Sequence, residues 1–152
     1  MNYNYEIRHL SNIFKIEYPE NLYPEFENKA KRPFVVFLVE IDNHIFAIPF
    51  RTNMNHKYGF KFSESNLNTR SSTGLDFTKA VLVDNTKLLG EKVRIDSKEF
   101  KKLNKKCLFI KNQFEKYYYN YKKYVKGELN NKLSEAYKYS TLKYFHKELD
   151  IK

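Results

Sequence analysis

The chain has 152 residues, 41% of them hydrophobic, with 13 Tyr and 13 Phe. This length suits a single domain over residues 1–152, and the apolar content is enough for a core, which excludes global disorder. Lys and Arg outnumber Asp and Glu by 28 to 18, so the net charge is +10. A field of this sign attracts polyanions, with nucleic acid as the first candidate and an anionic membrane surface as the second.

The positive charge gathers in the C-terminal third. Residues 1–96 carry 13 basic and 12 acidic side chains, whereas residues 97–152 carry 15 and 6. An AT-rich genome also favours Lys and Asn, but this origin would not change the physical consequence. Cys107 is the single cysteine, so no internal disulfide forms, which fits a reducing compartment. The sequence starts without a signal-peptide pattern and lacks an apolar stretch of ~18 residues, so we expect a cytoplasmic protein with no membrane partner.

In chain order, the first elements are a half-buried strand over 3–9 and a short helix over 11–18 that Ser11 caps. The β-branched and aromatic run 34–41, the turn pair Asp42-Asn43 and the strand 44–50 predict a β-hairpin. Pro49 cannot donate to a ladder and is expected at a sheet edge or strand end. The remaining predictions are strands at 58–62, 77–83 and 92–95 and a polar loop at 63–74.

Two helical regions follow the strands. Asp96 and Glu99 form a capping box at the start of a long helix, and Gly127 ends it. A second helical region covers about 131–149, with a break allowed at Ser140-Thr141. Strands that come first and are joined by short turns, with helices last, predict an α+β fold: a curved antiparallel sheet covered by helices, with a long C-terminal helical part. The residues expected to face the core from the long helix are Phe100, Leu103, Cys107, Ile110, Phe114, Tyr117, Tyr118, Tyr121 and Tyr124.

Several kinds of site are excluded by spacing. The four histidines are scattered, and no Cys or carboxylate pair has a metal-ligand spacing, so we expect no metal. The glycines are isolated, which excludes a phosphate-binding loop and a dinucleotide fingerprint, and with them a nucleotide cofactor. A nucleophile elbow is also missing from the sequence.

The segment 49–58 concentrates groups suited to RNA cleavage. It holds Arg51, Thr52, His56 and Lys57 directly after a strand. Attack by an RNA 2′-hydroxyl needs a base, an acid and fixed donors for the charge on phosphorus, and it needs no metal. His56 titrates near neutrality, Arg51 and Lys57 suit phosphate, and Thr52 can donate to a phosphoryl oxygen. The alternative is that this segment is a solvated polar loop after a hairpin, without a role in catalysis.

Further residues are candidates for RNA binding. The two hairpin strands place residues 32 and 51 at the same open end, where two like charges held close favour an anion between them. In residues 114–124 of the long predicted helix, aromatic side chains alternate with Lys, an arrangement typical of proteins that bind single-stranded RNA. Most of these rings lie on the helix face that is expected to pack on the core. The candidates are Lys29, Lys31, Arg32, Asn53, Tyr58, Arg70, Lys116, Tyr119, Lys122 and Lys123.

An ordered set of motifs resembles the type III toxin–antitoxin endoribonuclease toxins of the ToxN/AbiQ family. The hairpin segment 32–52 has a basic residue, an apolar strand, a turn, a second strand ending in Pro, and Thr52. His56-Lys57-Tyr58, the segment 74–81 and the ending 139–146 look like the TenpN branch. The resemblance spans most of the chain. By position it implies that Thr52 matches the family's catalytic Ser/Thr and that Arg32 matches its basic residue before the hairpin. The sequence departs from the family at two positions. Arg51 replaces a small polar residue, and Lys57 lies farther from Thr52 than the family's Lys does.

The resemblance implies a sheet related to MazF/Kid-type toxins and a sequence-selective RNA cleavage that leaves a 2′,3′-cyclic phosphate. It implies an antitoxin RNA of tandem pseudoknot repeats, which the toxin processes and binds in a closed hetero-oligomer. Cellular or phage mRNA would be the substrate, in plasmid maintenance or phage defence. Two alternatives stay open: a non-catalytic basic RNA-binding module, and a membrane-surface or scaffold protein that uses the basic helix.

Overall fold

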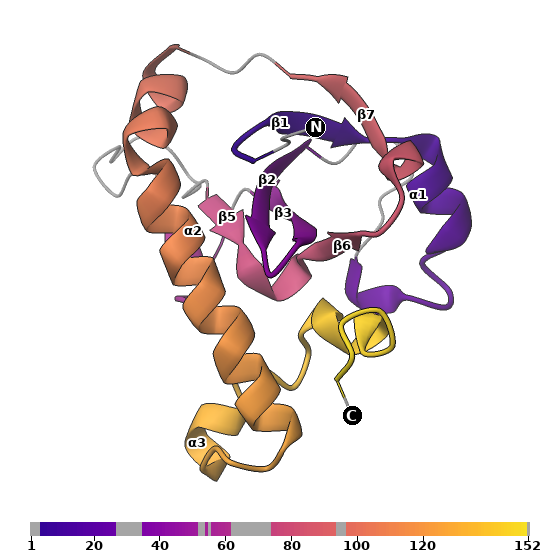
Figure 1. Ribbon diagram of the computed structural model, residues 1–152, viewed down its shortest axis with the longest axis vertical. Helices are drawn as coiled ribbons and strands as arrows, with labels where there is room; N and C mark the ends of the chain where they lie inside the picture. Colours follow the sequence, from indigo (N-terminus) through magenta and orange to yellow (C-terminus); the bar gives the residue numbers. More distant parts are fainter. Residues whose placement is uncertain are drawn as a thin grey trace.

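The computed structural model describes residues 4–26, 35–51, 54, 56–61, 74–93 and 97–151, without the side chains of 97–100 and 102. This part of the chain is an α+β fold with a seven-stranded antiparallel sheet, as predicted (Figure 1). The strands are β1 (Ile7–Leu10), β2 (Val35–Ile41), β3 (His44–Arg51), β4 (Gly59–Lys61), β5 (Gly74–Asp76), β6 (Val81–Val83) and β7 (Leu89–Lys92). The helices are α1 (Asn12–Glu17), α2 (Ser97–Val125) and α3 (Asn131–Ser134), with 3-10 turns η1 (Pro24–Phe26), η2 (Phe77–Lys79), η3 (Thr86–Leu88) and η4 (Thr141–Phe145).

Strand β3 organises the sheet, whose order is β4-β5-β3-β2-β1-β7. On one side β3 pairs with β2 along almost its whole length. On its other side the partner changes along the strand: β6 pairs with residues 45–47 and β5 with residues 50–51. The end of β3 therefore lies against β5, away from the hairpin turn.

The predicted β2–β3 hairpin is confirmed. Asp42 and Asn43 have φ of 53° and 65°, the left-handed conformation at both central positions of a two-residue hairpin turn. Pro49, however, is neither at an edge nor at a strand end, because β3 continues to Arg51. Hydrogen-bonded and non-hydrogen-bonded pairs alternate along the hairpin from the turn, and the pair of Pro49 with Val36 is a non-hydrogen-bonded one. The Pro49 nitrogen therefore points away from β2, toward the gap between the residues of β3 that pair with β6 and those that pair with β5. The missing N–H is tolerated there.

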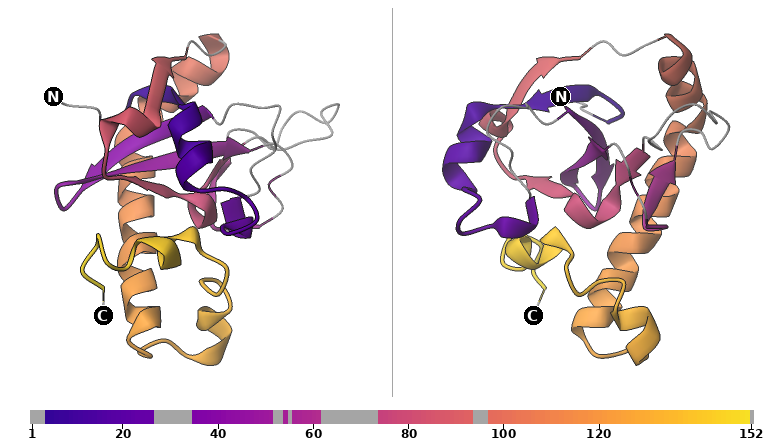
Figure 2. Two further views of the ribbon diagram at one scale, coloured as in Figure 1. Left: turned by 90° about the vertical axis from the view of Figure 1, so that its right-hand side faces the viewer. Right: turned by 180° about the vertical axis from the view of Figure 1, so that it is seen from behind.

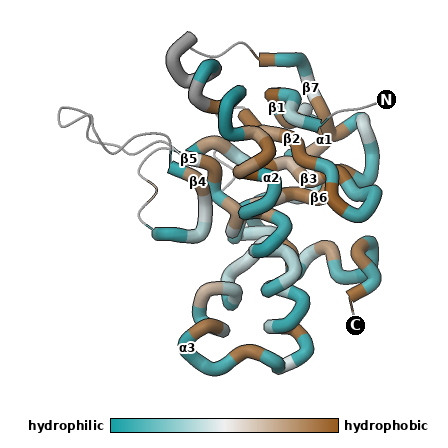
Figure 3. Tube along the Cα trace, turned by 60° about the vertical axis from the view of Figure 1, so that its left-hand side comes forward, coloured by the Kyte–Doolittle hydropathy of each residue, from teal (hydrophilic) through white to brown (hydrophobic). Residues whose placement is uncertain are grey.

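Helix α2 covers the sheet along one side, as two views agree (Figures 1 and 2). Its aromatic face is buried as predicted: Phe114 and Tyr118 pack on Phe46 of β3. Figure 3 shows the apolar strands beside the mixed hydropathy of α2. The helix ends in a Schellman motif, in which Gly127 has a φ of 74° and the amides of residues 127 and 128 donate to Tyr124 and Lys123. Asp96 of the predicted capping box lies outside the described residues.

The predicted helical region over 131–149 is confirmed only in part. α3, capped by the Asn130 side chain, is α-helical, turns follow it, and the 3-10 helix η4 begins at Thr141. Ser140 caps η4, at the predicted break. The Thr141 hydroxyl donates to the carbonyl of Ala80 at 2.6 Å, which ties this segment to the sheet. Tertiary contacts here outweigh the helical periodicity of the sequence.

Three strand predictions also need correction. The first strand begins at Ile7, whereas the prediction began at residue 3; the last strand is β7, earlier than the predicted 92–95. The predicted strand 77–83 is instead η2 followed by β6, because the Asp76 side chain accepts from the Thr78 amide and caps a turn. Ser11 occupies the N-cap of α1, but its hydroxyl donates to the Lys87 carbonyl.

Thr141→Val should destabilise the fold by about 1–2 kcal/mol, because Val fills the same space but leaves the buried Ala80 carbonyl without its donor. Urea denaturation followed by circular dichroism measures this. Thr86→Val, at an exposed threonine, is the matched control and should change stability by less than about 0.5 kcal/mol. Equal stability of the two variants would contradict the anchoring role of Thr141.

Candidate functional site

The polar segment that follows β3 is held against β4 and β5. Arg51, the last residue of β3, pairs with Gly74 of β5, and β4 pairs with the other side of β5. The chain between Arg51 and Gly59 therefore leaves one strand of this three-stranded part of the sheet and returns as its outermost strand. The described side chains of Arg51 and His56 are thereby brought next to the end of β5.

Met54 anchors the segment. Its side chain is 1% exposed and lies over Gly59 and Gly74. A Cβ atom on Gly74 would lie 2.7 Å from the Met54 methyl carbon and 2.5 Å from the Phe60 carbonyl oxygen. Glycine is therefore required at this position by close packing, and the thioether fits the narrow space above it.

Asp76, at the end of β5, is the centre of the site. Its side chain is fully buried. One carboxylate oxygen accepts from the Thr78 amide at 3.0 Å and from the Thr78 hydroxyl at 2.6 Å. The other oxygen accepts from Nη1 of Arg51 at 3.0 Å. Asp76 thus joins the end of β3 to the turn η2.

His56 completes the cluster, with Nε2 lying 3.1 Å from Oδ1 of Asp76. The N–H direction at Nε2 is not aligned with that oxygen, so the contact is mainly electrostatic. The other ring nitrogen, Nδ1, accepts from the Tyr58 amide at 3.1 Å. In this arrangement Nδ1 carries no proton, so the ring holds a proton on Nε2, the nitrogen nearer to the carboxylate.

The environment lowers the pKa of Asp76. Burial alone would raise this pKa, but the electrostatic contact with His56 and the hydrogen bonds from Thr78 and Arg51 outweigh it. Asp76 is therefore an ionised, fully paired carboxylate at neutral pH. It is an acceptor that positions other groups and not a proton donor.

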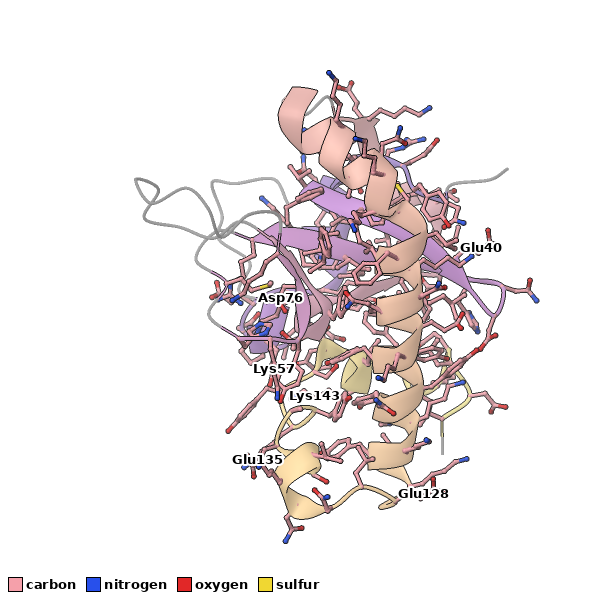
Figure 4. The ribbon with its side chains drawn as sticks, turned by 90° about the vertical axis from the view of Figure 1, so that its left-hand side faces the viewer. Glu40, Lys57, Asp76, Glu128, Glu135 and Lys143 are labelled. Atoms are coloured by element: carbon pink, nitrogen blue, oxygen red, sulfur yellow. The ribbon has the colours of Figure 1, made fainter. Side chains whose placement is uncertain are left out.

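Two cationic side chains of the cluster reach solvent. The Arg51 side chain is 37% exposed even though it is paired with Asp76. Lys57 is exposed, with Nζ 5.8 Å from the centre of the Tyr58 ring. Figure 4 shows Asp76 and Lys57 on the same side of the molecule, beside α2. Without counting His56, these two cations and the Asp76 carboxylate sum to a net charge of +1.

The structure brings together part of the predicted site. Arg51, His56, Lys57 and Tyr58 lie in one segment around Asp76. Six predicted site residues lie outside the described residues: Lys29, Lys31, Arg32, Thr52, Asn53 and Arg70. Asp76 of the chain itself is the anion beside Arg51, and the predicted closeness of residues 32 and 51 stays a prediction because Arg32 lies outside the described residues.

The predicted RNA contacts on α2 have different surroundings. Lys116 and Lys123 are exposed, away from the core. The Tyr119 hydroxyl donates to the Asp42 carboxylate at 3.1 Å, and Lys122 lies 4.4 Å from the centre of the Tyr118 ring and 5.5 Å from that of Tyr119. Tyr119 therefore links α2 to the hairpin turn, whereas the ammonium of Lys122 lies near two rings of its own helix, so both side chains are partly used within the protein.

Sequence reasoning missed Asp76 and Met54. Asp76 lies 25 residues from Arg51, so no local pattern connects them. The spacing Asp76-Phe77-Thr78 was a usable signal, because an Asp whose side chain accepts from the amide two residues on marks a turn. Met54 looked like an interruption between polar residues, and only the packing on two glycines shows its purpose.

Among the described residues, no group of three or more His, Cys, Asp and Glu side chains converges to hold a metal ion. No helix in the same part of the chain has the length and apolarity needed to span a membrane. Comparisons of the chain with models of protein families, with curated proteins and with solved structures found no match.

Asp76→Asn should lower the free energy of unfolding by about 2–3 kcal/mol at pH 7, because it removes the anion that pairs Arg51 and His56. The folded-state pKa is lowered, so the carboxylate's contribution is complete above the ordinary value of 3.8 and disappears as the pH falls through the folded-state pKa. The difference between the two proteins should therefore shrink below about pH 4. Urea denaturation from pH 3 to pH 7 tests this.

The matched control is Asp84→Asn, at an exposed aspartate. Its effect should stay below about 0.5 kcal/mol across the same pH range. A constant difference between wild type and Asp76→Asn at every pH would show that the lost contribution is one of shape and not of charge.

Proposed function

We propose that the chain is a metal-independent endoribonuclease, acting as the toxin of a type III toxin–antitoxin pair. It cuts RNA by attack of a 2′-hydroxyl on the adjacent phosphorus. The P–O5′ bond breaks, and the products are a 2′,3′-cyclic phosphate and a 5′-hydroxyl end. The proposal is supported by the cluster at the end of β3, by the net charge and by the ordered motifs described above.

One observation carries the proposal: a buried carboxylate fixes the segment that contains Arg51, His56 and Lys57. Burying a charge is unfavourable unless it is paired, so Asp76 holds its partners in one arrangement. Electrostatic catalysis depends on such fixed donors, because groups that are already oriented need no rearrangement as charge develops. The net charge of +1 matches one phosphodiester.

The cluster suggests a division of roles. The exposed part of the Arg51 guanidinium contacts a phosphoryl oxygen and stabilises the phosphorane. Lys57, which is exposed, protonates the leaving 5′-oxygen, and the proton of the attacking 2′-hydroxyl passes to solvent water. Thr52, next to Arg51 in the sequence, donates to a second phosphoryl oxygen. His56 is a positioning residue, since both ring nitrogens face groups of the protein, and this replaces the expectation that it moves the proton.

The wider proposal concerns fold relationship and partners. The antiparallel sheet with a long helix is compatible with a relationship to MazF/Kid-type and ToxN-type toxins. Arg32 and neighbouring cations bind flanking phosphates of the substrate, cellular or phage mRNA. A repeat RNA antitoxin occupies the same basic surface and is cut by the toxin into the units that inhibit it within a closed hetero-oligomer, in the cytoplasm.

A non-catalytic RNA-binding module is the second candidate. It is favoured by the positions of the two His56 nitrogens: Nδ1 accepts from the Tyr58 amide, and Nε2 is buried 3.1 Å from Oδ1 of Asp76, so neither nitrogen faces a substrate. The strong basic charge explains RNA binding without any cleavage. Both candidates predict binding that weakens steeply with salt, so cleavage alone separates them.

Lys57→Ala should reduce cleavage of a labelled single-stranded RNA pool at least 100-fold in EDTA-containing buffer, since loss of a general acid typically has an effect of about this size. The side chain is exposed and makes one ring contact, so the thermal midpoint should stay unchanged. Sequencing of the new ends identifies the cyclic phosphate.

Lys138→Ala is the matched control for Lys57→Ala. Lys138 is also exposed and lies over the next ring in the chain, with Nζ 5.6 Å from the centre of Tyr139. The Lys138→Ala variant should cleave RNA as the wild-type chain does. Absence of any cleavage by the wild-type chain would favour the binding module, whereas equal losses in both lysine variants would indicate a general effect of charge.

Thr52→Ala should abolish growth arrest on expression and reduce cleavage at least tenfold, because it removes the hydroxyl donor that the resemblance places at the scissile phosphate. Thr86→Ala, at an exposed threonine in η3, is the control. Growth arrest and RNA cleavage by Thr52→Ala at wild-type levels would refute this assignment. An array of short tandem repeats upstream of the gene would independently support the antitoxin RNA.

A further inference from the structure

We propose that the exposed pair Leu108 and Phe109, on the first half of α2, is a stacking platform for an unpaired base of RNA. This inference rests on the proposed function only in taking RNA as the ligand. The platform is defined by Leu108, Phe109 and the adjacent Lys105 and Lys106. It is distinct from the predicted contacts between residues 116 and 123, which lie farther along the helix.

Leu108 and Phe109 are unusually exposed for large apolar side chains. Leu108 is 63% exposed and Phe109 is 48% exposed. The Phe109 ring is nevertheless held in place: it meets buried Phe60 of β4 edge to face, with centroids 6.1 Å apart and an interplanar angle of 71°. A ring that is fixed on one side and open on the other can receive a base with little loss of side-chain freedom.

The surroundings of the pair select an anionic ligand. Nζ of Lys106 lies 5.3 Å from the centre of the Phe109 ring. Residues 97–112 contain six Lys and one Glu. A stacked base places its phosphate within reach of such cations, so the same few residues attract the strand and hold the base. A second copy of the chain would bring two strongly basic helices together, which is unfavourable.

The platform is close to the proposed cleavage site but on the other face of the sheet. Phe60 pairs with Leu75, and Gly59 pairs with Asp76. Neighbouring side chains along a strand point to opposite faces, so Phe60 and Asp76 face opposite sides. Because β4 is the outermost strand on this side of the sheet, an RNA strand leaving the site can pass around β4 to Phe109.

Tyr139 provides an internal comparison. It is 63% exposed, and Lys138 lies 5.6 Å from the centre of its ring, so the local pair resembles Lys106 and Phe109. Its chain segment has little net charge, since residues 127–152 contain five Lys and four acidic residues. Tyr119 with Lys122 is a further exposed ring with a neighbouring cation, but its hydroxyl is already bonded to Asp42. Compared with Tyr139, the pair at Phe109 lies in a strongly basic segment.

The test measures binding to two fluorescent probes by anisotropy. One probe is a 2′-O-methyl oligoadenylate, which has stacking bases but no 2′-hydroxyl and cannot be cleaved by the proposed reaction. The other is an abasic 2′-O-methyl ribose-phosphate strand of equal length. The proteins are the full chain, Phe109→Ala, Phe109→Leu and Tyr139→Ala. Phe109→Leu keeps an apolar side chain against Phe60 and guards against misfolding of the alanine variant.

Both Phe109 variants should weaken oligoadenylate binding about tenfold or more, while binding of the abasic strand changes less than about twofold. Tyr139→Ala should bind both probes as wild type does. Equal oligoadenylate affinity of wild type and Phe109→Leu would overturn the platform. Two other results would also overturn it, if the Phe109 variants bind oligoadenylate as wild type does. One is a dimer in sedimentation that is lost in these variants, and the other is binding to phosphatidylglycerol vesicles that is lost in them.

The two proposals fail separately. If the wild-type chain binds oligoadenylate through Phe109 but cuts no unmodified RNA, the platform stands and the endoribonuclease proposal fails. If it cuts RNA in a manner that depends on Lys57 and binds oligoadenylate independently of Phe109, the endoribonuclease stands and the platform fails.

Discussion

A buried carboxylate at the end of β5 is the constraint on which the candidate site depends. An ionised Asp76 in the interior would be strongly unfavourable without partners, and its two oxygens are satisfied by Arg51, His56 and Thr78. These partners come from the end of β3, the connecting segment and η2. A single requirement for charge pairing therefore fixes three parts of the chain, and the packing of Met54 on two glycines adds an apolar anchor to the same segment.

This arrangement separates the side chains that hold the site in place from the side chains that can contact a ligand. Asp76 and His56 face one another and the backbone, so their polar capacity is used within the protein. Arg51 and Lys57 keep a solvent-accessible side. Productive sites commonly combine an inner set of fixed groups with an outer set that touches the ligand. The negative charge of Asp76 balances the positive charge of Arg51, and Lys57 adds a further positive charge. The cluster is therefore weakly cationic and suited to one phosphodiester.

Local signals in the sequence predicted the hairpin and α2, because a two-residue turn and a helical aromatic repeat are each encoded within a short window. The same locality brought Arg51, His56 and Lys57 together as candidates. It failed for β5, a three-residue strand whose identity depends on pairing with β3 and β4. It failed again after residue 134, where contacts such as that of Thr141 with Ala80 replace a helix by turns. Asp76 was missed for the same reason, since its partners are distant in sequence.

The distribution of aromatic and basic residues on α2 follows from covering a sheet with one long helix. Phe114 and Tyr118 must face the strands, so Lys116 between them and Lys123 beyond them are directed to solvent. A basic outer face is thus partly a consequence of packing, and charge alone is a weak indication of an RNA surface. Phe109 is informative for a different reason: its exposed ring is not required by the core beneath α2, yet contact with Phe60 holds it in place. The exposed aromatic ring, more than the surrounding lysines, therefore distinguishes a surface built to bind from one that is merely solvated.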